Sequence, residues 1–343
     1  MLPLEHALKA FQNQIPERIP VCHFLGGSWP VLYKGSTLEE LIGDPERTAQ
    51  VFYQVNEEVD ADIIMVGTGS TAMIIRSLGG EVRFEGKGAP SIMGELIKSE
   101  GDLENIIDIA TAFKSSDIQW ILETAQCLFN LAGRNRLILA SGRAPFTLAG
   151  QMYGLEKLAK AIYKNPGFVH HLLEFTTRVS IAFFMSMVEN GFVHGAFIAD
   201  PSASGDVISK RHFEEFSLPY FIRVVAELKK SQAPIMLHIC GDIYDRLPSI
   251  ADTGIDCLSL DTKVNIAIAK QVVGDRICLA GNIDPVTVLE FGTPKDVVDS
   301  AKRCLEQGAR NNGFVLMPGC DFGPKVTLEN LKVLTKTAHQ WKK

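Results

Sequence analysis

The chain has 343 residues, enough for one large domain or two ordinary ones, and its 46% hydrophobic and 22% charged residues are usual for a soluble globular protein. Its net charge of −6, from 34 basic and 40 acidic residues, excludes a broad basic surface for nucleic acid. No apolar segment is long enough to cross a bilayer. We therefore expect neither a nucleic acid nor a membrane as partner.

The first residues and the cysteines bear on localisation. Residues 1–15 carry charged and polar groups between apolar residues at helical spacing, which indicates a helix rather than a signal peptide or a lipid anchor. The seven cysteines are odd in number and scattered, with no secretory signal, which is typical of reduced thiols. These features predict a cytoplasmic protein.

Short apolar runs of about five residues recur along the chain, and each is followed by polar or glycine-containing residues and then by a longer helical pattern. The runs predict eight strands, at 19–23, 62–66, 137–141, 195–199, 235–239, 256–260, 277–280 and 313–317. The longer patterns predict helices at 38–60, 115–132, 157–164, 166–190, 210–230, 243–253, 265–273 and 294–308.

Eight strand-plus-helix units predict an α/β fold of the closed (β/α)₈ TIM-barrel type, because parallel pairing and right-handed crossovers leave few other arrangements. No proline-rich or serine-rich linker divides the chain, so residues 1–343 are expected to form a single domain. A doubly wound open sheet is the alternative, although no G-x-G-x-x-G follows an early strand.

Two insertions depart from the repeat. Residues 81–98 alternate around a glycine-rich turn, which predicts a hairpin over the barrel mouth, and a solvated loop is the alternative. Residues 24–38 contain three glycines and a proline, and they form a second long connection after the first predicted strand.

The segment 234–242 combines a strand with two potential metal ligands. Side chains alternate along a strand, so His238 and Cys240 project to the same side. A thiolate and an imidazole together suit zinc. Cys320 follows a similar strand-then-turn pattern and is the expected third ligand. Two ordinary buried cysteines and a hydrogen-bonded histidine are the alternative to a zinc site.

In a TIM barrel the chemistry lies at the carboxyl ends of the strands. The polar residues predicted there are His23, 67–70, 142–143, Asp200, His238, Cys240, Asp261, Asn282, Asp284 and Cys320. We select Arg143, Asp200 and Asp261 as further catalytic candidates. Arg143 is placed to pair with an anionic substrate group or with a protein carboxylate. Asp200 serves the site or caps the next helix, and Asp261 reaches the metal or caps the segment that follows it.

Five motifs together resemble the uroporphyrinogen decarboxylase superfamily, in its branch of corrinoid-dependent methyltransferases. They lie at 141–149, 199–204, 237–241, 280–285 and 318–320, and the resemblance covers almost the whole chain. It implies a (β/α)₈ barrel in which His238, Cys240 and Cys320 hold Zn²⁺. Cobalamin-independent methionine synthase has a similar ligand set, in which the carboxylate corresponds to Asp261.

The resemblance implies a methyltransferase that moves a methyl group from a methylcorrinoid, carried on a partner protein, to a small thiol such as coenzyme M. Zinc would hold the thiol as a thiolate, which attacks the methyl group in line. Two alternatives remain, namely a decarboxylase and a corrinoid-dependent demethylase that runs the first half-reaction. Decarboxylases of this family grip propionate groups with arginines beyond the first strand, but residues 19–46 contain no arginine.

Overall fold

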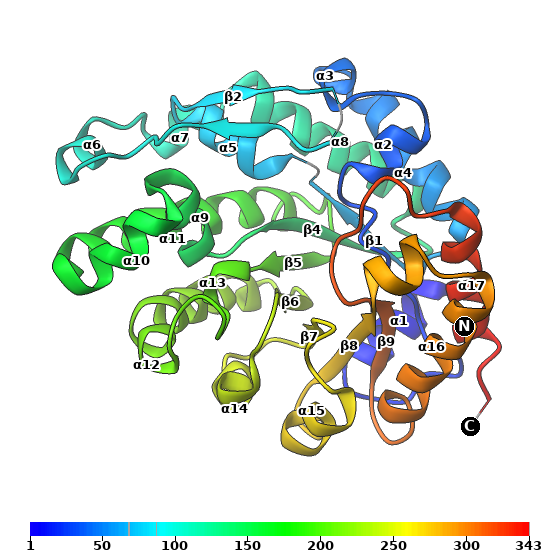
Figure 1. The fold of residues 1–343 in the computed structure, drawn as a ribbon. Helices are drawn as coiled ribbons and strands as arrows, with labels where there is room; N and C mark the ends of the chain where they lie inside the picture. The colour runs from blue at the N-terminus through cyan, green and yellow to red at the C-terminus, as the bar shows by residue number, and fades with distance from the viewer. Residues whose placement is uncertain (68, 87, 343) are drawn as a thin grey trace.

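A computed structural model describes residues 1–67, 69–86 and 88–342; Thr68 and Lys87, in two of the predicted loops, lie outside this range. A parallel sheet forms the centre of the molecule (Figure 1). In spatial order, its strands in the described residues are β1 (Ile63–Val66), β4 (Leu137–Arg143), β5 (Gly195–Ala199), β6 (Ile235–Ile239), β7 (Cys257–Leu260), β8 (Cys278–Ile283) and β9 (Phe314–Pro318).

The first of the eight predicted strands, at 19–23, is not a strand. Only two isolated parallel bridges occur there, from Val21 to Leu316 and from Cys22 to Ile63, so this segment links β9 to β1. Pro20 has no N–H, and the N–H of Val21 donates to the Asp62 carboxylate at 2.9 Å. Residues 20 and 21 therefore provide no backbone N–H group for hydrogen bonds to a neighbouring strand. The curled sheet consists of seven strands, and the segment 19–23 joins its two ends through two single bridges.

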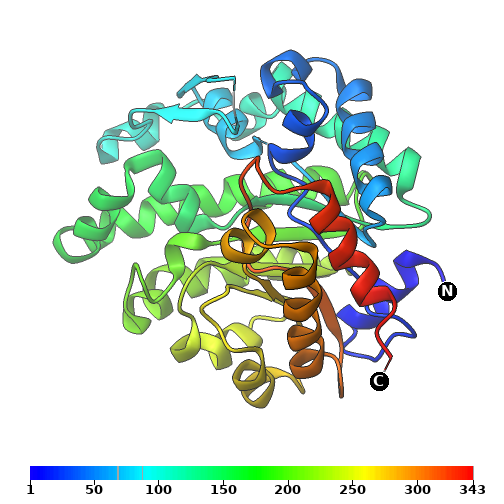
Figure 2. The same ribbon diagram turned by 45° about the vertical axis from the view of Figure 1, so that its right-hand side comes forward.

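Helices pack around the curled sheet and at its ends (Figures 1 and 2). In the first half they are α1 (Pro3–Phe11), α2 (Trp29–Tyr33), α3 (Leu38–Leu41), α4 (Pro45–Val59), α5 (Ser70–Ser77), α6 (Glu100–Asn105), α7 (Ile109–Ala112), α8 (Ser116–Ala132), α9 (Pro145–Tyr153), α10 (Leu155–Lys164) and α11 (Pro166–Val188). In the second half they are η1 (Pro201–Ala203), α12 (Lys210–His212), η2 (Phe213–Ser217), α13 (Leu218–Lys230), η3 (Tyr244–Arg246), α14 (Leu247–Ala251), α15 (Ile266–Val273), η4 (Pro285–Glu290), α16 (Pro294–Gly308) and α17 (Leu328–His339).

Local chemistry explains where two predicted helices break. The helix expected at 38–60 divides into α3 and α4, because Gly43 adopts a φ of +87° and Asp44 caps a new helix that begins at Pro45. The helix expected at 210–230 contains a π-helical segment, η2, between α12 and α13.

Two apolar clusters hold the fold together. The larger lies between the sheet and the helices, and it includes the outward side chains of β6, Ile235, Leu237 and Ile239. The smaller gathers the side chains of the opposite face, such as Met236, with residues of α1. Because side chains alternate along a strand, His238 lies on the same face as Met236, at the carboxyl end of β6.

The segment expected to form a hairpin contains an antiparallel pair, β2 (Glu81–Arg83) and β3 (Ser91–Met93), in which Val82 is opposite Ile92. The pair lies alongside α5 at one edge of the molecule (Figure 1). Within the part of the chain that is described, no helix is long and apolar enough to cross a membrane.

Candidate metal centre

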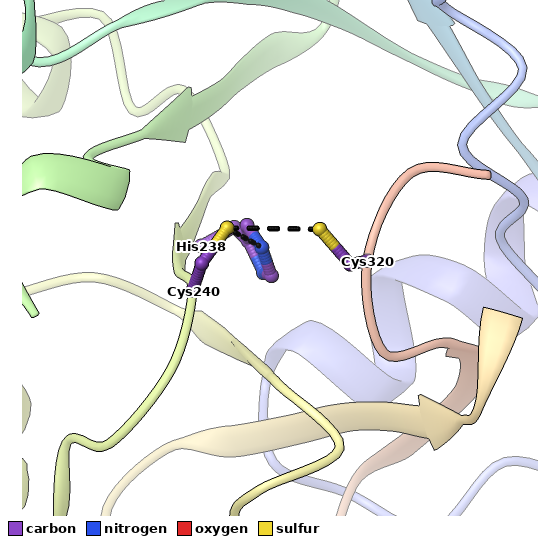
Figure 3. Close-up of side chains that lie close together, drawn as sticks. All are labelled: His238, Cys240 and Cys320. Atoms are coloured by element: carbon purple, nitrogen blue, oxygen red, sulfur yellow. Dashed lines mark hydrogen bonds between the residues drawn. The ribbon is translucent and has the colours of Figure 1, made fainter. Parts of the chain in front are cut away.

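His238, Cys240 and Cys320 converge at the carboxyl end of the sheet (Figure 3). The Nε2 atom of His238 lies 3.2 Å from the Sγ atom of Cys240, which in turn lies 3.6 Å from the Sγ atom of Cys320. The three potential ligand atoms lie within 4.8 Å of one another. His238 is buried, both cysteines are partly accessible, and both are free thiols.

Two glycines allow the turns that carry Cys240 and Cys320 to bring the two cysteines close to each other. Gly241, directly after Cys240, has a φ of +79°, and a Cβ atom there would lie 2.1 Å from the Asp206 carboxylate. Gly319, directly before Cys320, would place a Cβ atom 2.9 Å from the backbone nitrogen of Thr262. A side chain at either position would therefore displace the turn that carries a cysteine.

The His238 ring is fixed on three sides. Its Nδ1 atom lies 3.1 Å from the Oγ atom of Ser259, a fully buried residue of the neighbouring strand β7. The ring packs edge-on against Phe24 at a centroid distance of 5.3 Å, and it stacks on Phe197 at 6.2 Å. The hydrogen bond at Nδ1 leaves Nε2 to face the two sulfurs, which is how histidine ligands are commonly oriented.

The two thiols interact strongly with each other. The hydrogen bond with Cys240 lowers the pKa of the Cys320 thiol, and the adjacent His238 lowers it further. The same hydrogen bond and burial raise the pKa of Cys240. Two sulfurs that share a proton beside an imidazole fit a divalent metal, which replaces that proton and takes both as thiolates. The donor set, two sulfurs and one nitrogen, is one that zinc prefers.

His238, Cys240 and Cys320 line a cavity of about 320 Å³. Its wall includes Ala89 and Ile92 from the β2–β3 segment, and Gly26 and Gly27 from the connection after residue 23. Both insertions noted in the sequence thus border the cavity. A site of this volume, accessible from one side, suits a small organic molecule.

Arg143 and Asp321 bring opposite charges into the cavity wall. Arg143 ends β4, and its guanidinium group makes no hydrogen bond or ion pair with any described residue. Asp321 follows Cys320, and its Oδ1 atom accepts the N–H of Phe322 at 2.8 Å. Although much of Asp321 is solvent-accessible, loss of hydration within the cavity raises the pKa of its carboxyl group to about 6.

Asp200 lies behind the cavity wall and is buried. Its Oδ1 atom accepts the backbone N–H of Thr147 at 3.0 Å and the hydroxyl of Thr147 at 2.6 Å, while its Oδ2 atom accepts the hydroxyl of Ser217 at 2.9 Å. Burial raises the pKa of Asp200 to about 6, although these hydrogen bonds lower it. The carboxylate therefore ties β5 to α9 and to the segment before α13, and it does not line the cavity.

Asp261 follows β7 but does not join the ligand group found among the described residues. Its Oδ1 atom accepts the backbone N–H of Lys263 at 2.9 Å and the hydroxyl of Thr262 at 3.2 Å. The side chain of Lys263 pairs instead with Asp206 at 2.8 Å. In this arrangement Asp261 caps the turn that follows its strand.

Of the other polar residues expected at the rim, His23 is buried and contacts Thr335, and Asp284 caps η4. Sequence reasoning missed Ser259, Asp321 and Gln151, a cavity residue whose buried Oε1 atom has no hydrogen-bond partner. Asp321 directly follows an expected ligand, and Ser259 lies on the strand next to His238, but neither residue type is a signal by itself.

Comparisons with known proteins agree with this architecture. The chain is 28% identical to "Methylcobamide:CoM methyltransferase MtbA" of Methanosarcina acetivorans over 99% of its own length and 98% of the relative. It is 31% identical to "Methylcobamide:CoM methyltransferase MtaA" of Methanosarcina barkeri, over 68% of this chain and 66% of the relative. Among solved structures, a methyltransferase from Methanosarcina mazei superposes with a TM-score of 0.88 at 25% identity, covering 98% of each chain.

The family comparison gives the same result at a broader level. The model described as "Uroporphyrinogen decarboxylase (URO-D)" matches residues 2–341, which is nearly the whole chain. The relatives matched over 98% of their own length are methyltransferases, in agreement with the branch that the motifs indicate, while a protein named "Uroporphyrinogen decarboxylase" from Hydrogenovibrio crunogenus is matched over 77% of its length at 28% identity. The chain belongs to the uroporphyrinogen decarboxylase family.

Proposed function

We propose that the protein is a zinc-dependent methyltransferase that transfers a methyl group from a corrinoid, carried on a partner protein, to a small thiol. The observation that carries this proposal is the cluster of His238, Cys240 and Cys320 in the wall of a cavity of about 320 Å³. The relatives supply the reaction class, because their names specify a methylcobamide and coenzyme M. Methyl transfer is the activity that these relatives support for this chain.

The residues of the site would have different roles in the reaction. His238, Cys240 and Cys320 would hold zinc, and Ser259 keeps the His238 ring oriented with Nε2 towards the sulfurs. A zinc ion there would supply the positive charge that keeps a bound thiol deprotonated at neutral pH, where a free thiol with a pKa near 8.5 is mostly protonated. A thiol bound beside these residues would lie within the cavity and be partly enclosed by its wall.

The methyl transfer needs no reactant other than the thiol and the methylcorrinoid. The thiolate sulfur forms a bond to the methyl carbon while the carbon–cobalt bond breaks, and the electron pair of that bond stays on cobalt. The thiol proton leaves to solvent when the thiol binds. The open side of the cavity must therefore admit the methyl group of a corrinoid held by another protein. The β2–β3 segment and residues 24–28 border that opening.

Decarboxylation of a porphyrinogen is the alternative within the family. A substrate with many carboxylates needs several cationic partners. Among the described residues of the cavity wall, Arg143 is the only lysine or arginine. The stretch from residue 19 to residue 46 contains no arginine, so the connection after the first predicted strand supplies none. These charges favour methyl transfer over decarboxylation.

Metal analysis together with a methylcobalamin assay tests the proposal. We expect about one zinc per chain after zinc-replete expression, and zinc-dependent demethylation of methylcobalamin by at least one small thiol. Cys320→Ser should lower both. Cys127→Ser, in α8 and outside the cavity, should lower neither. Protein that contains no zinc, or activity that survives complete chelation, would refute the metal-dependent transfer.

A further inference from the structure

The cavity contains two charged groups that the metal centre does not use. Arg143 ends β4, and Asp321 follows β9, so the two approach the cavity from different strands of the curled sheet. No described residue forms an ion pair with either side chain. Both charges are therefore available to a ligand that enters the cavity.

The two charges also do not neutralise each other. Arg143 and Asp321 line the same cavity, yet the two groups form no ion pair within 4.0 Å. A cation and an anion that are not paired with each other thus lie in the wall of one cavity of about 320 Å³. A ligand with both a negative and a positive group would satisfy each of them.

The metal group fixes a third point. Cys320 and Asp321 are neighbours in the chain, and His238 and Cys240 lie in the same cavity wall. A thiol at the metal would thus lie beside the Asp321 carboxylate, with Arg143 on another strand. The cavity therefore presents a thiol-binding group, an anion and a cation to one small molecule.

On the basis of the proposed function, we propose that the methyl acceptor is a zwitterionic thiol, an α-amino acid with a thiol side chain. Its carboxylate would pair with Arg143, and its ammonium group would donate to the Oδ2 atom of Asp321, which accepts no hydrogen bond from a described residue. The amide of Gln151, whose Oε1 atom lacks a partner, offers a further hydrogen bond in the same wall.

A thiol with only a negative group fits this cavity less well. Such a molecule would pair with Arg143, but it would leave the Asp321 carboxylate without a cation and close to a second negative charge. A thiol with only a positive group would leave Arg143 unpaired. The arrangement therefore selects for both charges in one ligand, since each mismatch leaves a charge of the cavity wall without a partner.

Matched thiols of one chain length test the inference on the unaltered, zinc-loaded protein. Homocysteine has both charges, mercaptobutyrate lacks the ammonium group, and mercaptopropylamine lacks the carboxylate. We expect calorimetric binding of homocysteine to be about ten- to a hundredfold tighter than that of either analogue, because each lost charge-assisted contact has about that effect. Equal binding of the three thiols, or a preference for mercaptoethanesulfonate over homocysteine, would overturn the inference.

Two substitutions locate the contacts. Arg143→Met should weaken homocysteine and mercaptobutyrate binding far more than mercaptopropylamine binding, while Asp321→Asn should weaken homocysteine and mercaptopropylamine binding far more than mercaptobutyrate binding. Arg211→Met and Asp299→Asn, on exposed parts of α12 and α16, are the charge-matched controls. Zinc content is measured for every variant, and losses that are equal across the thiols would contradict the assignment.

The outcomes separate this inference from the proposed function. Transfer of methyl groups to thiols without a preference for the zwitterion leaves the proposed function intact and refutes the inference. If no thiol accepts a methyl group and none binds to the zinc-loaded protein, the proposed function itself fails.

Discussion

Removal of the Ser259 hydroxyl should weaken zinc binding even though Ser259 is not a ligand. Its Oγ atom lies 3.1 Å from the Nδ1 atom of His238, and no solvent reaches the serine. With the hydroxyl as acceptor, the proton stays on Nδ1 and the lone pair of Nε2 points at the two sulfurs. In Ser259→Ala the Nδ1–H group loses its partner, so the ring is free to rotate or to change tautomer.

The size of the effect follows from the role of such partners. Loss of a hydrogen bond that orients a metal-bound histidine typically lowers metal affinity by about ten- to a hundredfold, or roughly 1.4 to 2.7 kcal/mol. The stability of the metal-free fold should change less, by about 1 kcal/mol, the usual net contribution of a hydrogen bond. Phe24 and Phe197 still enclose the ring, which should limit its displacement.

Competition with a chromophoric chelator measures the zinc affinity, and urea unfolding of the metal-free protein measures stability. Ser217→Ala is the matched control, because Ser217 is equally buried and its hydroxyl donates to Asp200 at 2.9 Å, away from the metal ligands. Both variants should lose similar stability, but only Ser259→Ala should lose zinc affinity. An unchanged affinity in Ser259→Ala, or an equal loss in Ser217→Ala, would refute the reasoning.

Three further predictions concern other parts of the chain. Burial lowers the pKa of His23 from 6.5 to about 3, so between these pH values the unfolded chain binds a proton that the folded protein excludes. The free energy of unfolding should therefore fall by about 1.4 kcal/mol per pH unit as the pH drops from 6.5 towards 3. Urea unfolding of His23→Gln should lack this part of the pH dependence. Shortening of the β2–β3 segment should impair transfer from a corrinoid protein more than transfer from free methylcobalamin, because the segment borders the cavity opening; equal loss with both donors would assign it to folding. Asp261→Asn should leave the X-ray absorption spectrum at the zinc edge unchanged, because the Asp261 carboxylate caps the turn at Lys263 and an asparagine can do the same. A change in the scattering from nitrogen and oxygen neighbours of zinc would instead make Asp261 a ligand.

The candidate metal ligands were accessible to sequence reasoning because their positions follow from strand periodicity. His238 and Cys240 are two residues apart at the end of a buried apolar run, so alternation places them on one face. Cys320 follows a similar run, and the carboxyl ends of parallel strands meet at one edge. The prediction needed no knowledge of loop conformation, since all three residues lie within two positions of a strand.

The parts that sequence reasoning missed depend on contacts between distant segments. The run at 19–23 has the apolar composition of a strand, but the N–H of Val21 donates to Asp62, 41 positions away, instead of to a neighbouring strand. For Asp261 a local contact decides instead, because the N–H of Lys263 donates to its carboxylate at 2.9 Å. Composition does not distinguish a carboxylate that caps a turn from one that reaches a metal.

Arg143 shows what the structure adds to a residue that the sequence had already identified. At the sequence level an arginine after a strand is as consistent with a structural ion pair as with a substrate contact. In the structure Arg143 forms no ion pair with a described residue. The hydrogen bond with Cys320 raises the pKa of Cys240, burial raises the pKa values of Asp200 and Asp321, and the positive charge of Arg143 only partly opposes each rise. The guanidinium group of Arg143 thus weakly stabilises the ionised forms of all three groups, but it forms an ion pair with none of them. Its guanidinium group therefore keeps its donors available to a ligand that enters the cavity.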